Sequence, residues 1–519
     1  MKKTLLISLC FLISTALSAQ ITFQKTYGGE YYESATCMVK HPEGGFLIIG
    51  NTMSYGGHYQ DIYALRVNQL GEIMWTKTYG GPGSNKGNAV CVTNDSGFII
   101  TGHSYILNDD DIFVVRTDKN GDTLWTKLYG DTGRYDIGNS IHQTVDGGFL
   151  IGGLSGNNNQ SNGILLRINS QGDKLWSRKF GTIIRSVSCT NNDEYIAYGD
   201  IVDFFGVSDL FWIKTNSLGF VIGSKEYGGS GQDQAHFMSQ NPDSGFILGS
   251  NSTSFQGSML ALRVDANGDT LWTKTYDGDI DTSIYFQSIS PSNDGGFIIT
   301  GRAEYFDHAT WAFTSKVLLV RTDSMGEVLW SKIYGGANYS SGMCLMQNPD
   351  SGYIISGHSN SFSFFDDCYL IRTDINGNSF CNEKNLKINS YSTGLDATNA
   401  FMPVGNATII VKSTLTTTGE GGTENIQCAR YRGEPGANNS LLLFPNPAGK
   451  NELIKVWWSE GQTTVSGKIE IFTITGQVYF ETTMNDQPFI LDIKKFTSGI
   501  YIVKVQTEKG SIVKKLIVQ

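Results

Sequence analysis

Proline is scarce in this chain, and segments with helical periodicity are nearly absent. Only 10 of the 519 residues are Pro, whereas 61 are Gly, and aromatic residues make up 12% of the chain. This composition is not typical of disordered or collagen-like chains, and it favours many short strands joined by tight turns. Beyond the N-terminal segment no stretch reaches about 18 apolar residues, so we expect no transmembrane helix.

Signatures of catalysis and of metal binding are also missing. The seven His residues show no metal-ligand spacing, and the chain has no G-x-S-x-G, H-E-x-x-H or phosphate-binding loop. The net charge of −10 argues against nucleic acid as a partner, which requires a basic surface. We therefore expect no catalytic residue, no metal, no cofactor and no nucleic-acid partner, and we expect a monomer.

The eight cysteines do not form a disulfide framework. Most of them stand in apolar strand contexts, where a small buried core residue is the favoured interpretation; these are Cys37, Cys91, Cys189, Cys344 and Cys368. Cys381 and Cys428 differ, because they bracket a polar segment outside any buried strand pattern. In an exported protein such residues can oxidise, so we predict a Cys381–Cys428 disulfide, with two free thiols as the alternative.

The N-terminus has the pattern of a secretory signal. Lys2 and Lys3 precede a mostly apolar run from Leu5 to Ile13, and small residues follow before Gln20. A short apolar core of this kind is removed on export. We therefore predict a signal peptide over residues 1–19.

One twenty-residue sequence motif recurs along the chain. In its clearest form it is DIFVVRTDKNGDTLWTKLYG at Asp111–Gly130, which predicts two strands around an Asn-Gly turn. Counted on the Trp position, the copies lie about fifty residues apart, a period typical of propellers and solenoids. The copies are centred on Phe23, Trp75, Trp125, Trp176, Gly223, Trp272 and Trp330.

Each repeat predicts four antiparallel strands, which is the content of a propeller blade. The chain begins with a fourth-type strand at Ile21–Tyr27 and ends its repeats with a third-type strand at Asp367–Asn378. We infer that the N-terminal strand completes the last blade. The prediction is an all-β protein, with a seven-bladed β-propeller of four-stranded blades over residues 20–381.

Three further motifs carry a resemblance to known families. Tyr-Gly-Gly, Asp-Gly-Gly-Phe and Asp-x-x-Gly-x-x-x-Trp resemble the propeller repeats of secreted Bacteroidetes-type proteins. Leu443-Phe444-Pro445-Asn446-Pro447, followed by KIEIFTITGQVYF and LDIKKFTSGIYIVKVQ, resembles the type A C-terminal sorting domain of the type IX secretion system. The second resemblance implies a small β-sandwich over residues 441–519, contact with the type IX machinery, and release or attachment at the cell surface. Residues 382–440, rich in Ser, Thr and Gly, are interpreted as a linker.

Four acidic residues follow the Tyr-Gly element by about six positions: Glu33, Asp136, Asp233 and Asp281. In a propeller they would surround the channel mouth, where they could hold a cation or bind sugar hydroxyls. The favoured alternative is that they cap the turn into the innermost strand.

Aromatic residues in the loops between second and third strands are the other candidates. Exposed on one face, they would stack on sugar rings or on a partner's side chains, and the alternative is that they cover the blade tops. They are Tyr305, Phe306, Trp311, Phe313, Phe204, Phe205, Phe364 and Phe365.

The sequence thus predicts a secreted or cell-surface protein that binds a glycan or a protein without catalysis. Two alternatives stay open. One is a glycan-active hydrolase or lyase, which would need a pair of carboxylates at the channel mouth. The other is a purely structural surface protein.

Overall fold

The computed structural model describes residues 21–519 except for 58, 82, 107–108, 158–159, 203–205, 280, 308–311, 401, 403, 407–409, 414–416, 420, 422, 432–438, 445–452, 461–466, 474–476, 485–488, 508–509 and 519. Every regular element in the described part is a β-strand. No helix long and apolar enough to cross a membrane occurs among these residues. Ile21–Arg430 forms one compact unit, and Tyr431–Gln519 belongs to another.

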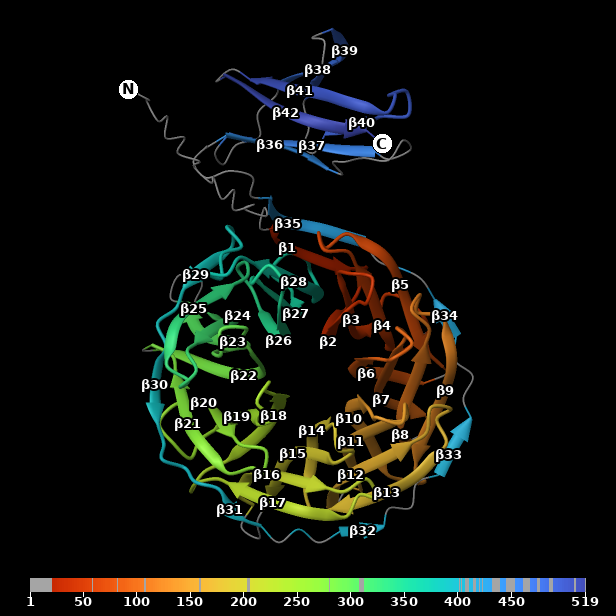
Figure 1. Ribbon diagram of the computed structural model, residues 1–519, viewed down its shortest axis with the longest axis vertical. Helices are drawn as coiled ribbons and strands as arrows, with labels where there is room; N and C mark the ends of the chain where they lie inside the picture. Colours follow the sequence, from red (N-terminus) through yellow and green to blue (C-terminus); the bar gives the residue numbers. More distant parts are fainter. Residues whose placement is uncertain are drawn as a thin grey trace, which may run out of the picture. The chain divides into compact units, whose positions relative to one another are not determined.

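The first unit is built from antiparallel sheets that share a four-strand plan, and Figure 1 shows them arranged around a ring with their first strands innermost. The first strands are β2 (Glu33–Lys40), β6 (Ser84–Val92), β10 (Tyr135–Gln143), β14 (Ile183–Cys189), β18 (Asp233–Gln240), β22 (Thr282–Pro291) and β26 (Ser340–Gln347). The second strands are β3 (Phe46–Thr52), β7 (Phe98–Ile106), β11 (Phe149–Asn157), β15 (Tyr195–Val202), β19 (Phe246–Ser252), β23 (Phe297–Asp307) and β27 (Tyr353–Ser359).

The outer half of each sheet consists of the two strands of the recurring motif. The third strands are β4 (Asp61–Val67), β8 (Asp109–Thr117), β12 (Gln160–Ile168), β16 (Ser208–Thr215), β20 (Met259–Val264), β24 (Ala312–Thr322) and β28 (Asp367–Thr373). The fourth strands are β5 (Ile73–Gly80), β9 (Thr123–Gly130), β13 (Lys174–Phe180), β17 (Val221–Tyr227), β21 (Thr270–Asp277), β25 (Val328–Tyr334) and β1 (Ile21–Gly28). We number these groups repeat sheets 1 to 7 in the order of their first strands, so that β1 belongs to sheet 7, where it pairs with β28.

Residues of the recurring motif also form the contact between neighbouring sheets. A Cβ on Gly121, in the turn before β9, would lie 2.7 Å from the Trp75 ring of the preceding sheet. The Tyr79 hydroxyl donates to the carbonyl of the same Gly121 (2.8 Å), and Lys77 pairs with Asp122. Only Gly lets the ring approach the turn backbone this closely. In sheet 1 the fourth strand therefore docks its Trp, Lys and Tyr on the turn of the next sheet.

The same contact joins sheet 7 to sheet 1. In β1 the Trp position is held by Phe23, whose ring lies 2.7 Å from a Cβ built on Gly71. The Tyr27 hydroxyl donates to the Gly71 carbonyl at 2.5 Å. Residues of sheets 7 and 1, including Phe23, Phe46 and Leu370, share one buried core.

Sheet 4 lacks the docking Trp and replaces it from another strand. Gly223 occupies the Trp position of β17, while the fully buried Trp212 of β16 lies beside it. A Cβ on Gly268 of the next turn would lie 2.7 Å from the Trp212 ring. A third-strand Trp thus fills the space that the fourth-strand Trp occupies elsewhere.

Residues 383–431, interpreted from the sequence as a linker, instead add one outer strand to each repeat sheet (Figure 1). We call this segment the belt. Exposed outer edges carry unpaired N–H and C=O groups, and pairing satisfies them. Its strands run backward around the sheets, from sheet 6 to sheet 1 and then to sheet 7: β29 (Glu383–Asn385), β30 (Asn389–Ser392), β31 (Thr398–Asn399), β32 (Val404–Asn406), β33 (Ile410–Ser413), β34 (Thr417–Gly419) and β35 (Thr423–Tyr431).

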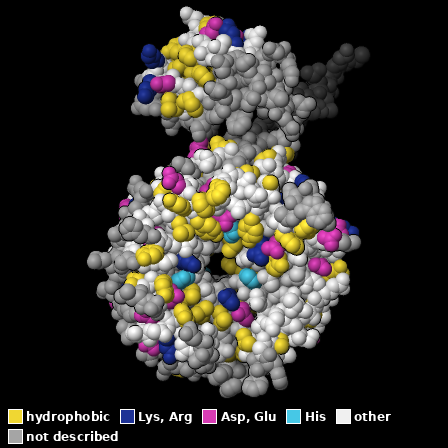
Figure 2. All heavy atoms as spheres, turned by 180° about the vertical axis from the view of Figure 1, so that it is seen from behind, with side chains coloured by type: hydrophobic (Ala, Val, Ile, Leu, Met, Phe, Trp, Pro, Cys, Tyr) yellow, Lys and Arg dark blue, Asp and Glu magenta, His cyan; other side chains and the backbone are white. Residues whose placement is uncertain are grey.

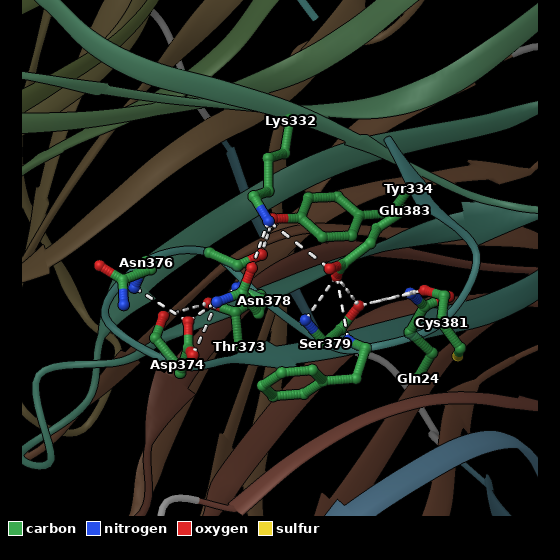
Figure 3. A network of polar contacts seen from close by, with 12 residues as sticks. Gln24, Lys332, Tyr334, Thr373, Asp374, Asn376, Asn378, Ser379, Cys381 and Glu383 are labelled. Carbon is green, nitrogen blue, oxygen red and sulfur yellow. Dashed lines mark hydrogen bonds and ion pairs between the residues drawn. The ribbon is translucent and has the colours of Figure 1, made fainter. Parts of the chain in front are cut away.

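A polar network fixes the start of the belt (Figure 3). The Glu383 carboxylate accepts from the Ser379 amide (2.6 Å) and hydroxyl (2.7 Å) and from the Phe380 amide (3.1 Å). Gln24 of β1 donates to the Ser379 hydroxyl at 2.7 Å and to the Cys381 carbonyl. Phe380 has a φ of +69°, a strained conformation for a non-glycine residue that these contacts stabilise.

The C-terminal unit contains two antiparallel sheets. One sheet has the order β36 (Asn439–Phe444), β37 (Leu453–Glu460), β40 (Phe489–Asp492), and the other has the order β39 (Val478–Met484), β38 (Gly467–Thr473), β41 (Gly499–Thr507), β42 (Gly510–Val518). Side chains from both sheets, such as Val456, Ile471 and Val503, form one buried core. The C-terminal unit thus has two antiparallel sheets around a shared core.

Candidate ligand-binding site

The loops between second and third strands and the loops between repeat sheets leave from one face, because successive strands are antiparallel. We call it the loop face. Figure 2 shows His, Lys, Arg, Asp and Glu side chains gathered around the central opening. Large apolar side chains that are exposed on the loop face are Tyr31, Met53, Tyr59, Tyr105, Tyr135, Phe313, Phe364 and Phe365.

The innermost strands line the opening, and each has one extra residue in a β-bulge. The bulged residues are Thr36, Asn88, Asn139, Arg185, His236, Gln287 and Met343. Bulges re-aim side chains and are common beside functional sites.

The bulged residues divide the ring into two halves. In sheets 1 to 3 the side chains of Thr36, Asn88 and Asn139 each donate to a backbone carbonyl of the next sheet, at 2.7–2.9 Å. In sheet 4, Arg185 instead pairs with Asp200 within its own sheet (3.2 Å). In sheet 5, His236 contacts Asn251 of its own sheet at 2.7 Å. The ionisable bulged residues, Arg185 and His236, therefore lie on sheets 4 and 5.

Three of the four predicted channel-mouth acids are buried turn caps. Glu33 accepts from the Thr52 hydroxyl (2.6 Å) and the Gly29 amide (2.7 Å). Asp136 accepts from the Asp131 amide (2.9 Å), and Asp233 from the Ser254 hydroxyl (2.7 Å). Asp281 is exposed in a turn, with a φ of +68°. These contacts fit the capping alternative better than a shared acidic ring.

The aromatic candidates separate into two groups. β23 and β24 extend as a hairpin to Asp307 and Ala312, so the loop expected around Tyr305 is shorter than predicted. Tyr305 packs partly against the core of sheets 5 and 6, and Phe306 lies 5.3 Å from the exposed Phe313 across the two strands. Trp311, Phe204 and Phe205 lie outside the described residues.

Phe364 and Phe365 belong to a larger cluster where sheet 7 meets sheet 1. Phe365 lies 6.0 Å from Tyr31 and 5.0 Å from Phe364, measured between ring centroids. Phe364 is 91% exposed, Tyr31 54% and Phe365 40%. These three rings form an apolar shelf on the loop face, and sugar rings or apolar side chains stack on such surfaces.

Polar groups flank the shelf. Tyr32, next to Tyr31, is hydrogen-bonded to the carboxylate of Asp366, next to Phe365. The Glu33 amide donates to the Asp366 carbonyl at 2.7 Å, which joins the two loops. His358 of β27 stacks on Tyr339, with centroids 5.7 Å apart. We call the shelf together with Tyr32, Tyr339, His358 and Asp366 the junction site.

Two buried atoms of the junction site have unused hydrogen-bonding capacity. Nδ1 of His358 and Oδ1 of Asp366 have no hydrogen-bond partner among the described residues. Leaving such atoms unpaired costs free energy, and in native structures each calls for an explanation such as a ligand or an ordered water. The site is therefore prepared to accept further hydrogen bonds.

Burial dominates the electrostatics of the site. It lowers the pKa of His358, opposed by the nearby Asp366 carboxylate, so the imidazole is neutral at pH 7. Burial raises the pKa of Asp366, which His358 opposes. Burial, followed by the charge of Asp366, raises the pKa of Tyr32. Burial, with added repulsion from Glu33 and Asp366, raises the pKa of neighbouring Asp367 to about 6.

An arginine links the junction site to the rest of the opening. This residue is Arg302 of β23. Its guanidinium stacks over the Tyr285 ring at 4.3 Å and forms an ion pair with Glu304 at 2.6 Å. Its charge lowers the pKa of both His236 and His358, after the larger effect of burial. Arg302 therefore affects the protonation of histidines on two different sheets.

Sequence reasoning identified Phe364, Phe365 and Glu33 but not their neighbours Tyr31, Tyr32, Tyr339 and Asp366. These residues follow the Tyr-Gly-Gly element or precede a third strand, and two such loops meet only because β1 belongs to sheet 7. The usable signal was that Tyr32 and Tyr339 stand at the equivalent position after a Tyr-Gly-Gly element.

Cys381 is disulfide-bonded in the structure, whereas Cys37, Cys91, Cys189, Cys344 and Cys368 are free. The Cys428 side chain lies outside the described residues. The pairing of Cys381 with Cys428 stays a prediction.

Residues 442–519 match the family described as secretion system C-terminal sorting domain. A crystal structure of a protein of unknown function from Dyadobacter fermentans DSM 18053 is similar to the chain at 8% identity, with a TM-score of 0.42. That similarity covers 69% of this chain and 100% of the other. No curated protein matches the chain. The C-terminal family match shows that the protein is exported by the type IX secretion system, whose machinery its sorting domain contacts, and is secreted or held at the cell surface.

Proposed function

We propose that Ile21–Arg430 is a closed seven-bladed β-propeller that acts outside the cell as a non-enzymatic binding module for a glycan or a protein. The repeat sheets are its blades, and β1 supplies the fourth strand of the seventh blade. Residues 1–19 are a signal peptide that takes the chain to the periplasm, and the sorting domain then directs export across the outer membrane.

The pairing of β1 with β28 supports closure. So does the repetition, between Phe23, Tyr27 and Gly71, of the contact that joins the other neighbouring sheets. A closed ring removes the open sheet edges that would otherwise promote aggregation. The belt strands also pair with the outer edge of each repeat sheet.

The junction site is the observation that carries the binding function. The exposed rings of Tyr31, Phe364 and Phe365 form a cluster beside unpaired polar atoms, and contiguous exposed apolar surface of this kind marks interaction sites. The enzymatic alternative needs two carboxylates that can reach a substrate. Glu33, Asp136 and Asp233 accept hydrogen bonds in the turns that they cap, and Asp281 is exposed in a separate turn, so the four acids offer no evident catalytic pair among the described residues.

The test exposes the purified protein to a glycan array and, in parallel, to the outer-membrane proteins of the producing cell. Saturable binding to a glycan or a protein, with no product released from the same glycans, is expected. Turnover of a glycan would support the hydrolase or lyase alternative. Absence of any saturable ligand would support a structural role.

A further inference from the structure

We propose that the junction site binds a neutral saccharide, whose rings stack on Tyr31, Phe364 and Phe365 and whose hydroxyls bond to Asp366 and His358. This inference rests on the proposed binding function and narrows its ligand. It also places the ligand at one boundary of the ring, between the last repeat sheet and the first.

The shelf has the chemistry that a sugar face requires. Sugar C–H groups pack against aromatic rings, whose apolar bodies gain from the burial of exposed area. The backbone of Tyr31 is held in place, because its amide donates to the Ser54 hydroxyl at 2.9 Å. The Asp366 carbonyl next to Phe365 is held by the Glu33 amide at 2.7 Å. The shelf is thus preorganised at its base, which reduces the entropy lost on binding.

The polar edge offers groups that match hydroxyls. A sugar hydroxyl both donates and accepts, so it can donate to Asp366 Oδ1 and bond to Nδ1 of the neutral His358. Both atoms are buried and unpaired among the described residues. Tyr339, stacked on His358, holds the imidazole plane in place.

The charges around the site favour a ligand without net charge. The carboxylates of Glu33, Asp366 and Asp367 influence one another there and would repel an acidic sugar. The positive charge of Arg302 lowers the pKa of His358 and disfavours a cationic group nearby. Neutral hydroxyl groups avoid both penalties.

The chain contains matched controls for both halves of the site. Phe364→Ala removes a ring from the shelf, and Phe313→Ala removes an equally exposed ring (82% against 91%) from sheet 6. His358→Asn removes the imidazole, and His103→Asn does the same at the equivalent position of sheet 2, where Nδ1 is also unpaired. Asn suits this position, because Asn51 and Asn251 occupy it in sheets 1 and 5 and accept backbone amides of the next sheet at 2.9 and 2.7 Å.

Isothermal titration calorimetry measures binding to purified protein spanning residues 20–519. The neutral ligands are cellohexaose, xylohexaose, laminarihexaose and mannohexaose, and oligogalacturonate is the acidic ligand for comparison. We expect at least one neutral oligosaccharide to bind. Phe364→Ala and His358→Asn should each weaken it by about tenfold or more, which corresponds to about 1.4 kcal/mol. Phe313→Ala and His103→Asn should leave Kd within about twofold.

Different results would contradict the proposed binding function and the proposed saccharide site. Neutral binding that all four variants leave unchanged would overturn the junction site while the binding function stands. Binding of oligogalacturonate alone would overturn the neutral ligand class. If no oligosaccharide binds but an outer-membrane protein does, the saccharide inference fails and the proposed function survives in its protein form.

Discussion

The contact between neighbouring repeat sheets can be tested with two glycines of equal backbone conformation. Gly121 has a φ of +77°, and a Cβ there would lie 2.7 Å from the Trp75 ring. Gly147 has a φ of +83°, and a Cβ there would meet no atom within 4 Å. Both lie in tight turns whose amide bonds back to the turn's first carbonyl. Ala at either position therefore imposes the same backbone strain, but only one variant disturbs the docking of Trp75.

The expected free energies of unfolding separate the two effects. A left-handed conformation costs a non-glycine residue about 1–2 kcal/mol, so Gly147→Ala should destabilise by this amount. Gly121→Ala adds an overpacking cost of about 1–3 kcal/mol, because neither the ring nor the backbone can move freely.

Guanidinium denaturation followed by Trp fluorescence measures the difference directly, since the docked Trp rings report on these contacts. The midpoint for Gly121→Ala should fall clearly below that for Gly147→Ala, with similar slopes for the two variants. Equal midpoints would refute the claim that Trp docking on the turn glycine holds neighbouring sheets together.

Other perturbations test further parts of the account. Deletion of Ile21–Tyr27 should expose the edge of β28 and cause aggregation or loss of cooperative unfolding, and a truncated protein that melts like the full chain would contradict closure. Deletion of Leu441–Gln519 should leave the repeat sheets folded and retain the protein in the periplasm, whereas normal export would contradict the role of the sorting domain. The pKa of Asp367 is raised to about 6, so the native state binds more protons than the unfolded state between about pH 4 and 6. Stability relative to Asp367→Asn should therefore fall as pH rises through this range and stay constant above it; a difference that does not vary with pH would show that the carboxyl is not perturbed. Non-reducing peptide mapping should recover Cys381 linked to Cys428, and recovery of both as free thiols would refute that pairing.

The repeat sheets could be predicted because their signals are local and repeated. Asn-Gly turns such as Asn120-Gly121, the apolar third strands and the fifty-residue period each indicate the same architecture. The phase of the repeats also predicts that Ile21–Tyr27 associates with the last repeat, and β1 pairs with β28. In the sorting domain the motif KIEIFTITGQVYF lies on β38 and β39, and LDIKKFTSGIYIVKVQ lies on β40 and β41.

The belt could not be predicted, because its stability does not come from its own side-chain pattern. β31 has two residues and β29 has three, and their sequences show no apolar alternation. They form by pairing with outer edges that exist only after the sheets have assembled. One specific contact, the ion pair of buried Lys25 with Glu424 at 2.6 Å, joins residues far apart in the sequence and gives no local signal.

The junction site was only half predictable for a related reason. Phe364 and Phe365 stand out as an aromatic pair in a polar loop, but Tyr31 and Tyr32 lie at the other end of the repeat region. Only the placement of β1 in sheet 7 brings the two loops together. Likewise, His103 and His358 occupy equivalent sequence positions, but after burial the nearby charge that acts on the pKa is Lys86 for His103 and Asp366 for His358.

Hydrogen–deuterium exchange of the N-terminal strand tests the closed ring most directly. β1 pairs with β28 on one side and with β35 on the other, so the peptide covering Ile21–Gly28 lies inside a sheet. Its amides should exchange as slowly as those of β9 or β21, which occupy the same place in sheets 2 and 5. Exchange of this peptide at the rate of an unpaired terminus, while β9 and β21 stay protected, would contradict the closed propeller.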